Sequence, residues 1–332
     1  MKKVLLINFF IFLIIISILE VGARSLNLAN LLGVKKNLFI LNQSTPTHHA
    51  NVESIAYGKK IFTDQYGFRV PKINYSYEKK QTNILLLGDS VSFGVGVSEE
   101  DSFVGILRKK NKNFNFYNSS VIGHHLESYF QVLSNYNSII DYENILIFIC
   151  LNDIHFVDGV QNEEKLIFNQ KNKPFIYKLK TNKTLIKINF FLRDKSVLYV
   201  YFKSIFSKPS ERYFNATYPK YQKKNLVDEY EKKIKKLKFF SDTHNKNISF
   251  VILPYEFQTR KNNCNEKNLL PQQTIKKILK KNDLLAIDLS QKFCNYKEPK
   301  SLYLKHDPVH LSKAGHKFVV SLIDEYDILN NR

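Results

Sequence analysis

The chain has 332 residues, of which 44% are hydrophobic and 24% are charged, a composition typical of a globular protein with a full core. The 50 Lys and Arg residues exceed the 30 Asp and Glu residues, which gives a net charge of +20. Because the lysines are spread along the chain and no nucleic-acid-binding motif is present, the sequence argues against nucleic acid as a partner. Attraction to anionic lipid or polysaccharide is compatible with this charge.

The N-terminus indicates a membrane anchor. Two lysines precede an apolar run from Val4 to Leu19, and this order predicts a cytoplasmic N-terminus followed by an exported chain. Residues 1–24 are therefore expected to form a signal anchor or transmembrane helix, with the remaining chain in the periplasm or at the cell surface. Val21-Gly22-Ala23 is an alternative cleavage site, but the flanking charges of Glu20 and Arg24 favour an uncleaved anchor.

Residues 25–82 are polar and are expected to form a connector, with an ordered segment from Thr63 to Arg69 that turns at Gly67. Apolar strands then alternate with amphipathic helices over residues 83–328, which predicts a parallel sheet covered on both faces. Strands are expected at 83–88, 114–118, 144–151, 247–254 and 284–290, and helices at 99–110, 124–136, 224–244, 274–281 and 312–326.

Residues 156–222 interrupt the alternation and are basic and aromatic. We interpret them as an insertion over one edge of the sheet, which either shapes a substrate cleft or lies on the bilayer. Extra helices packed on the core are an equally good interpretation.

Two motifs supply a nucleophile and a base. Gly88-Asp89-Ser90 follows the first strand, where α/β folds place their sites, so the Ser90 hydroxyl can project into the crevice. Asp307-Pro308-Val309-His310 precedes the last helix. Across a turn at the start of that helix, the Asp307 carboxylate can hold Nδ1–H of His310 while Nε2 faces the serine. Each motif alone is equally typical of helix capping, and His306 is a rival base.

Two further residues can stabilise an oxyanion. Gly123 follows the second strand and Asn152 ends the third. The backbone N–H of Gly123, the side-chain amide of Asn152 and the N–H of Ser90 are suitable donors for acyl transfer. A turn glycine and a strand-end asparagine are the structural alternatives.

Taken together, these elements resemble the SGNH/GDSL hydrolase family. Its blocks are matched by Gly88-Asp89-Ser90, Gly123, Asn152-Asp153 and Asp307-x-x-His310, over about residues 83–328 without the insertion. The resemblance implies a three-layer α/β/α, flavodoxin-like fold. It also implies that Ser90 is the nucleophile, His310 the base and Asp307 its orienting partner, with Gly123 and Asn152 in the oxyanion hole. One departure is Cys150, which stands where the third block usually has glycine.

The expected activity is therefore hydrolysis of an O-acyl ester, in particular an acetyl group on a cell-envelope glycan, without a metal or other cofactor. The alternatives are an O-acyltransferase that works beside a membrane-embedded O-acyltransferase, and a non-catalytic glycan-binding envelope protein. Among the three cysteines, Cys150 is expected to be a buried free thiol. Cys264 and Cys294 are the likelier pair if the domain is exported, and two free thiols are the alternative.

Overall fold

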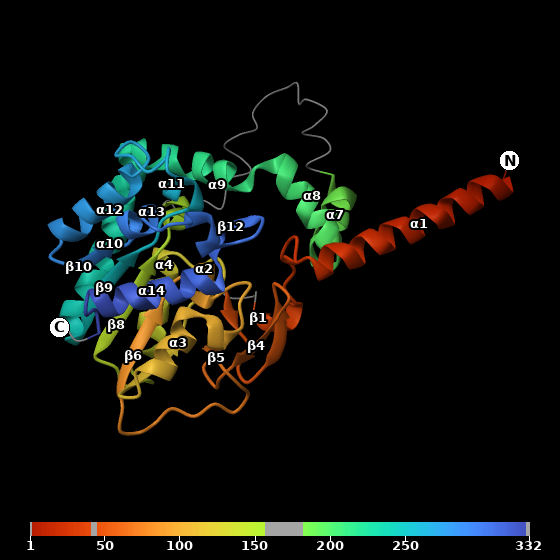
Figure 1. Cartoon of the computed structure of the whole chain (residues 1–332). Coiled ribbons are helices and arrows are strands. Elements are labelled where there is room, and N and C mark those ends of the chain that lie inside the picture. Colours follow the sequence, from red (N-terminus) through yellow and green to blue (C-terminus); the bar gives the residue numbers. More distant parts are fainter. Residues whose placement is uncertain (1, 41–44, 157–181, 330–332) are drawn as a thin grey trace.

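The computed structural model describes residues 2–40, 45–156 and 182–329. Its centre is a parallel sheet in the order β10-β9-β8-β6-β7 (Figure 1). Counted from β6, this is the flavodoxin-like order 2-1-3-4-5, whose direction of winding reverses between β6 and β8. The five strands are β6 (Thr82–Leu87), β7 (Phe114–Asn118), β8 (Asn144–Ile149), β9 (Asn247–Ile252) and β10 (Leu285–Asp288).

Helices cover both faces of this sheet, as the alternating pattern predicted. In β6, Ile84 and Leu86 face one layer of helices, whereas Leu85 and Leu87 face the other. The first layer contains α3 (Phe103–Lys110), α13 (Ser290–Cys294) and α14 (Lys313–Glu325), and the second contains α4 (Leu126–Tyr136), α10 (Lys224–His244) and α12 (Leu270–Lys281). The expected three-layer α/β/α fold is confirmed.

Several element ends differ from the sequence expectation. The helix expected at 99–110 begins as the 3-10 turn η2 (Glu99–Asp101), and α3 starts only after Ser102, whose side chain accepts the Gly105 N–H. The strand expected at 144–151 ends at Ile149 and is followed by the 3-10 helix η3 (Leu151–Phe156). Ser312 caps α14 as expected, because its hydroxyl accepts the Gly315 N–H at 3.2 Å.

The polar connector is itself folded. After η1 (Lys36–Leu38), it forms two antiparallel sheets, β1-β2 and β3-β4-β5. The predicted turn is present at Gly67, which has φ 79° and donates its N–H to the Asp64 carbonyl. An apolar cluster joins Ile61 of this segment to Phe93 of the main domain. The strands are β1 (Phe39–Ile40), β2 (Thr47–His48), β3 (Glu53–Ala56), β4 (Lys59–Thr63) and β5 (Arg69–Val70).

The first helix, α1 (Lys2–Ser25), extends away from the body, and among the described residues its contacts with the domain are at its C-terminal end (Figure 1). That end lies beside α8, part of the expected insertion. The described part of the insertion consists of α7 (Lys183–Lys195), α8 (Val197–Ser207), α9 (Pro209–Thr217) and η4 (Tyr218–Gln222), whereas 157–181 lie outside the described residues.

The cysteines occupy their expected states. Cys264 and Cys294 form a disulfide, which ties the segment after α11 (Glu256–Thr259) to the end of α13. Cys150 is free and buried directly after β8.

Candidate active site

Ser90 is the first residue of the short helix α2 (Ser90–Phe93), at the carboxyl edge of the sheet. Gly88 leaves no room for a side chain, since a Cβ there would lie 2.2 Å from the Ser92 hydroxyl. The Asp89 carboxylate accepts the Val91 N–H at 2.8 Å and so caps α2. The Gly-Asp-Ser sequence therefore fixes a tight strand-to-helix turn at the reversal point of the sheet.

Ser90, His310 and Asp307 form one hydrogen-bonded chain. His310 Nε2 lies 2.8 Å from the Ser90 Oγ, and His310 Nδ1 lies 2.8 Å from the Asp307 Oδ2. All three residues are less than a tenth exposed: Ser90 9%, Asp307 7% and His310 8%. This is the geometry in which an imidazole takes a proton from a serine while a carboxylate holds its other nitrogen.

The backbone that carries Asp307 and His310 differs from the expectation. They lie in the strand β12 (Asp307–Leu311), paired with β11 (Tyr303–Leu304), and not at a turn that begins a helix. A regular strand points residues three apart to opposite faces. The pairing shifts register between Tyr303 and Leu304, so β12 is not part of a regular ladder at this point.

The surroundings of His310 favour its protonated form. Burial lowers the pKa of His310, but the charge and hydrogen bond of Asp307, aided by the charge of Asp89, outweigh it, and the pKa lies above its ordinary value. A positively charged imidazolium at His310 is thereby stabilised.

The rival base, His306, has other partners. Its Nδ1 lies 2.6 Å from the hydroxyl of Ser204 on α8, and its ring contacts Tyr201 edge-on. Burial and the charge of Lys305 lower the pKa of His306. His306 therefore joins the insertion to the β11–β12 hairpin, while His310 bonds Ser90.

Asn152 lies in η3, where two partners orient its side chain. The amide Nδ2 donates to the Asp89 Oδ2 at 3.2 Å, and the Oδ1 accepts the Tyr255 hydroxyl at 3.2 Å. One amide hydrogen remains for another acceptor. Asp89 thus links the cap of α2 to Asn152.

Gly123 has φ 87°, and a Cβ at this position would meet nothing within 4 Å, so its backbone faces open space. Within the described residues, no acceptor takes the backbone N–H of Gly123 or of Ser90. These N–H groups are consistent with the expected oxyanion donors, whose roles stay predictions.

The residues beside Asn152 brace the loop. Asp153 is buried and accepts the Tyr129 hydroxyl at 3.1 Å. Burial and the neighbouring charge of Asp89 raise the pKa of Asp153 well above its usual range. Burial likewise raises the pKa of the Cys150 thiol, which occupies the position where the family has glycine. Burial therefore keeps both side chains in their neutral forms.

Arg69 supports the nucleophile turn from the N-terminal segment. Its fully buried guanidinium donates to the carbonyls of Phe93, the last residue of α2, and of Gly94 and Val97, which follow it. Burial lowers the pKa of Arg69 to about 10, so the group stays charged at neutral pH. A cation on three carbonyls makes strong hydrogen bonds and fixes the chain just after Ser90.

Sequence reasoning missed Tyr57. This residue lies in the two-residue turn between β3 and β4, with φ 50°, and Gly58 beside it has φ 71°. The Tyr57 ring meets the His310 ring edge-on, with 5.6 Å between centroids. Burial raises the pKa of Tyr57, so its hydroxyl stays protonated. The Tyr-Gly pair signals a hairpin, but no local pattern shows that the hairpin reaches His310.

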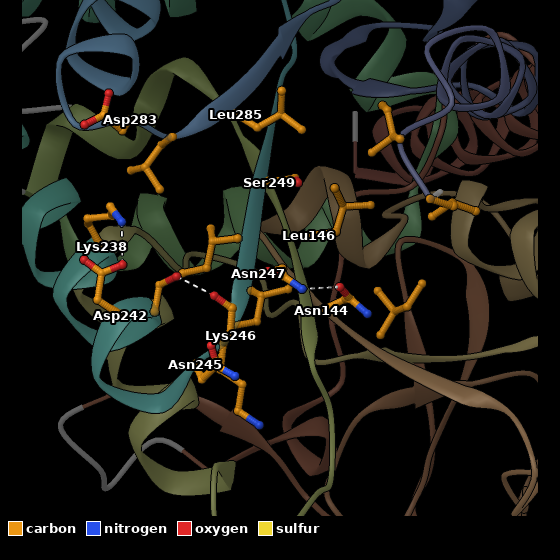
Figure 2. A pocket seen from close by; sticks show the side chains of 17 residues that line it. Asn144, Leu146, Lys238, Asp242, Asn245, Lys246, Asn247, Ser249, Asp283 and Leu285 are labelled. Carbon is orange, nitrogen blue, oxygen red and sulfur yellow. Dashed lines mark hydrogen bonds and ion pairs between the residues drawn. The ribbon is translucent and has the colours of Figure 1, made fainter. Parts of the chain in front are cut away.

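A cavity of about 220 Å³ adjoins the triad and is lined by Tyr57, Asp307 and His310 together with residues of α7, α8 and α9. A second cavity, of about 510 Å³, lies at the opposite end of the sheet (Figure 2). There, Asn144 and Asn247 begin β8 and β9 and bond one another, and Lys238 pairs with Asp242. The triad lies at the other ends of the strands, and Asp307 and His310 line the smaller cavity.

No family model matches the chain, and no curated protein matches it. Several solved structures are similar in fold. An acetyl xylan esterase, AlAXEase, has 13% identity and a TM-score of 0.43, covering 74% of this chain and 98% of its own. The lipase/acylhydrolase from Enterococcus faecalis has 12% identity and a TM-score of 0.42, covering 74% and 95%. A lipolytic G-D-S-L family member from Veillonella parvula has 14% identity and a TM-score of 0.40, covering 74% and 97%.

The strand order and the hydrogen bonds between Ser90, His310 and Asp307 are properties of this molecule itself and do not depend on its similarity to other structures. The chain has a flavodoxin-like α/β/α fold whose carboxyl edge carries a serine, a histidine and an aspartate joined by hydrogen bonds.

Proposed function

We propose that this protein is a serine esterase in which Ser90 is the nucleophile, His310 the general base and Asp307 its orienting partner. The observation that carries the proposal is the pair of 2.8 Å hydrogen bonds that joins these three side chains. The alternative for each motif alone is a capping serine and a surface histidine. That alternative does not account for a buried histidine that bonds both a serine hydroxyl and a buried carboxylate.

The reaction follows from this arrangement. The Ser90 Oγ attacks the ester carbonyl while its proton passes to the His310 Nε2. The oxyanion that forms is held by the N–H groups of Ser90 and Gly123 and by the amide of Asn152. The intermediate then expels the alcohol, which takes the proton from His310. Water, deprotonated by the same imidazole, releases the acid and restores Ser90.

The substrate that we propose is an O-acyl ester, in particular an acetyl group, on a cell-envelope glycan. The helix α8 contacts the end of α1 and also lines the cavity beside His310, which supports an envelope substrate. The net charge of +20 supports attraction to anionic envelope polymers. Transfer of the acyl group to a sugar hydroxyl would use the same triad and differ only in the acceptor.

The test is covalent labelling of the nucleophile. A fluorophosphonate probe should label the wild-type protein at Ser90, and Ser90→Ala should lower turnover of p-nitrophenyl acetate by about 10³-fold or more. Ser92→Ala is the matched control, because Ser92 belongs to the same helix but lies outside the triad. Wild-type turnover by a folded Ser90→Ala protein would refute the assignment.

We further propose that α1 is retained as a membrane anchor with its N-terminus in the cytoplasm. It has 24 residues and a mean hydropathy of 2.8 over its most apolar part, and that part is unburied. Its length of about 36 Å exceeds the roughly 30 Å hydrocarbon core of a bilayer. The two lysines at its start favour the cytoplasmic side.

Contacts at the end of α1 support an uncleaved anchor. The Glu20 carboxylate accepts the backbone N–H groups of Val197 and Leu198 at the start of α8, and Arg24 donates to the Lys195 carbonyl. A carboxylate at a helix N-terminus is stabilising. Cleavage at Val21-Gly22-Ala23 would remove Glu20 and leave these N–H groups without it.

The same contacts place α7 and α8 at the end of the anchor, and both helices carry exposed apolar side chains. They include Phe190, Phe191, Phe202 and Phe206, each between 49% and 84% exposed. We propose that they enter the lipid interface, because they are exposed and apolar and their helices lie at the end of the span. The full-length protein should stay in membranes after a carbonate wash, and a C-terminal reporter should be active only outside the cytoplasm. A soluble product that begins near Arg24 would refute the anchor.

A further inference from the structure

The cavity beside the triad is basic. Three cationic side chains line it: Arg193 from α7, Lys203 from α8 and Arg212 from α9. Among the described residues of its lining, Asp307 is the sole acid, and the carboxylate of Asp307 is bonded to His310. The cavity therefore presents an excess of positive charge next to the catalytic base.

These cations are held on aromatic rings and by neutral groups. Arg193 lies 5.9 Å from the ring centroid of Phe190, and Arg212 lies 5.2 Å from that of Tyr213. Lys203 lies over Tyr199 and also donates to the Asn189 amide oxygen. In the part of the chain that the structure describes, no carboxylate lies within ion-pair distance of the three cations. Within the described residues, therefore, the three cations are positioned without an acidic partner.

The three cations also repel one another across the cavity. Burial lowers the pKa of Lys203, and the charges of Arg193 and Arg212 lower it further. Like charges that converge on a cavity without a counter-charge cost free energy, and an anion placed among them would offset this cost. Guanidinium groups are the donors best matched to carboxylate and phosphate.

We propose that this cavity is a substrate subsite for an anionic group, a carboxylate or a phosphate, carried by the molecule that bears the ester. The proposal rests on the proposed esterase function and adds the substrate class. Arg193, Lys203 and Arg212 bind the anion, and the protonated Tyr57 hydroxyl supplies a further donor. His310 lines the same cavity as the three cations. A substrate whose anionic group binds there therefore has its scissile ester held at a defined distance from that group, next to His310.

The placement of α8 suggests how such a substrate is delivered. Glu20 holds the start of α8 at the end of the anchor, and Lys203 and Ser204 of the same helix line the cavity. The anion therefore comes either from an acidic sugar of a glycan or from a phosphate near the membrane surface. Both sources carry an anionic group that the subsite would bind. Inhibition by a carboxylate sugar and by a sugar phosphate distinguishes between them.

The test compares two esters that differ in charge, 4-acetoxybenzoate and 4-acetoxybenzamide, with the full-length protein in detergent. The ratio of kcat/KM for the anionic ester over the neutral ester is measured for wild type, Arg193→Gln, Lys203→Gln and Arg212→Gln. Each substitution should lower this ratio about fivefold, and the Arg193→Gln/Lys203→Gln double variant about 30-fold. The KM for the anionic ester alone should rise with salt.

Lys232→Gln is the matched control, because it removes one positive charge from the exposed face of α10, away from the cavity. Its ratio should equal that of wild type. Glucuronate and glucose 1-phosphate should inhibit hydrolysis of the neutral ester more strongly than glucose does, and the stronger inhibitor identifies the source of the anion. Thermal unfolding confirms that each variant is folded, and Arg212, which is exposed, supplies a variant whose folding is least at risk.

An unchanged ratio in folded Arg193→Gln, Lys203→Gln and Arg212→Gln proteins overturns the subsite while leaving the esterase intact. Failure of the wild-type protein to hydrolyse either ester, with no labelling of Ser90 by a fluorophosphonate, refutes the esterase proposal itself.

Discussion

Replacing Asp307 with asparagine tests the triad most sharply, because it removes one charge and keeps the shape of the side chain. Asp307 and His310 are 7% and 8% exposed, so solvent screens their interaction little. At a charge separation of about 4 Å and an effective dielectric constant of about 20, the carboxylate stabilises the imidazolium by about 4 kcal/mol. Losing that stabilisation in the transition state predicts about a 10³-fold lower kcat/KM. An amide that donates to Nδ1 would also impose the wrong tautomer and bring the loss to about 10⁴-fold.

The assay is p-nitrophenyl acetate hydrolysis from pH 5 to 10. In the wild type, kcat/KM should rise with pH through a midpoint above the ordinary pKa of histidine, because Asp307 raises the pKa of His310 and the base must be neutral. In Asp307→Asn the midpoint should fall below that of wild type, since burial alone lowers this pKa. Asp324→Asn on α14 is the matched control and should keep both rate and profile.

The same pair affects stability. The folded-state pKa of His310 is raised, so its protonation stabilises the folded state below the unfolded pKa, and this contribution is lost as pH rises through the folded pKa. Asp307→Asn should therefore lose more stability at pH 5 than at pH 9, as measured by urea unfolding. A folded Asp307→Asn protein with more than about a tenth of wild-type kcat/KM would refute the role assigned to Asp307.

Three other predictions follow from the contacts around the site. Asn152→Ala should lower kcat by about 10²–10³-fold with a near-normal KM, because the amide acts on the transition state; a raised KM with normal kcat would contradict this. Arg69→Met should lower the free energy of unfolding by about 3 kcal/mol or more, because it removes charged hydrogen bonds to three carbonyls and leaves those of Phe93 and Val97 without this donor, and Arg69→Lys should recover only part of it in urea titrations. Cys294→Ser should cost about 3–4 kcal/mol, since the disulfide to Cys264 closes a loop with a sequence separation of 30; an unchanged unfolding midpoint under oxidising conditions would refute the bond.

The sequence alone determined that the chain forms a parallel sheet, and it showed which strands are followed by candidate site residues. Apolar runs bounded by polar turns are local signals, so β7 and α10 have the bounds expected from them. Gly88-Asp89-Ser90 is a compact motif whose backbone geometry is set within a few residues. The residue types of Asp307-x-x-His310 were likewise recognisable in the sequence, but the strand β12 that carries them was not expected, because it depends on pairing with β11. The apolar run at the N-terminus is local in the same sense, and it predicted α1.

Only the tertiary structure decided what surrounds the triad. The contact of Ser90 with His310 spans 220 residues of sequence, and the bonds of Glu20 to α8 span 177 and 178. Tyr57 reaches His310 because a hairpin of the N-terminal segment folds back on the main domain, and Arg69 reaches the carbonyls after α2 for the same reason. Such contacts leave no periodic or local pattern, because chain closure over long separations depends on the packing of the whole core. The basic cavity likewise exists only where three helices of the insertion meet the strand that carries His310.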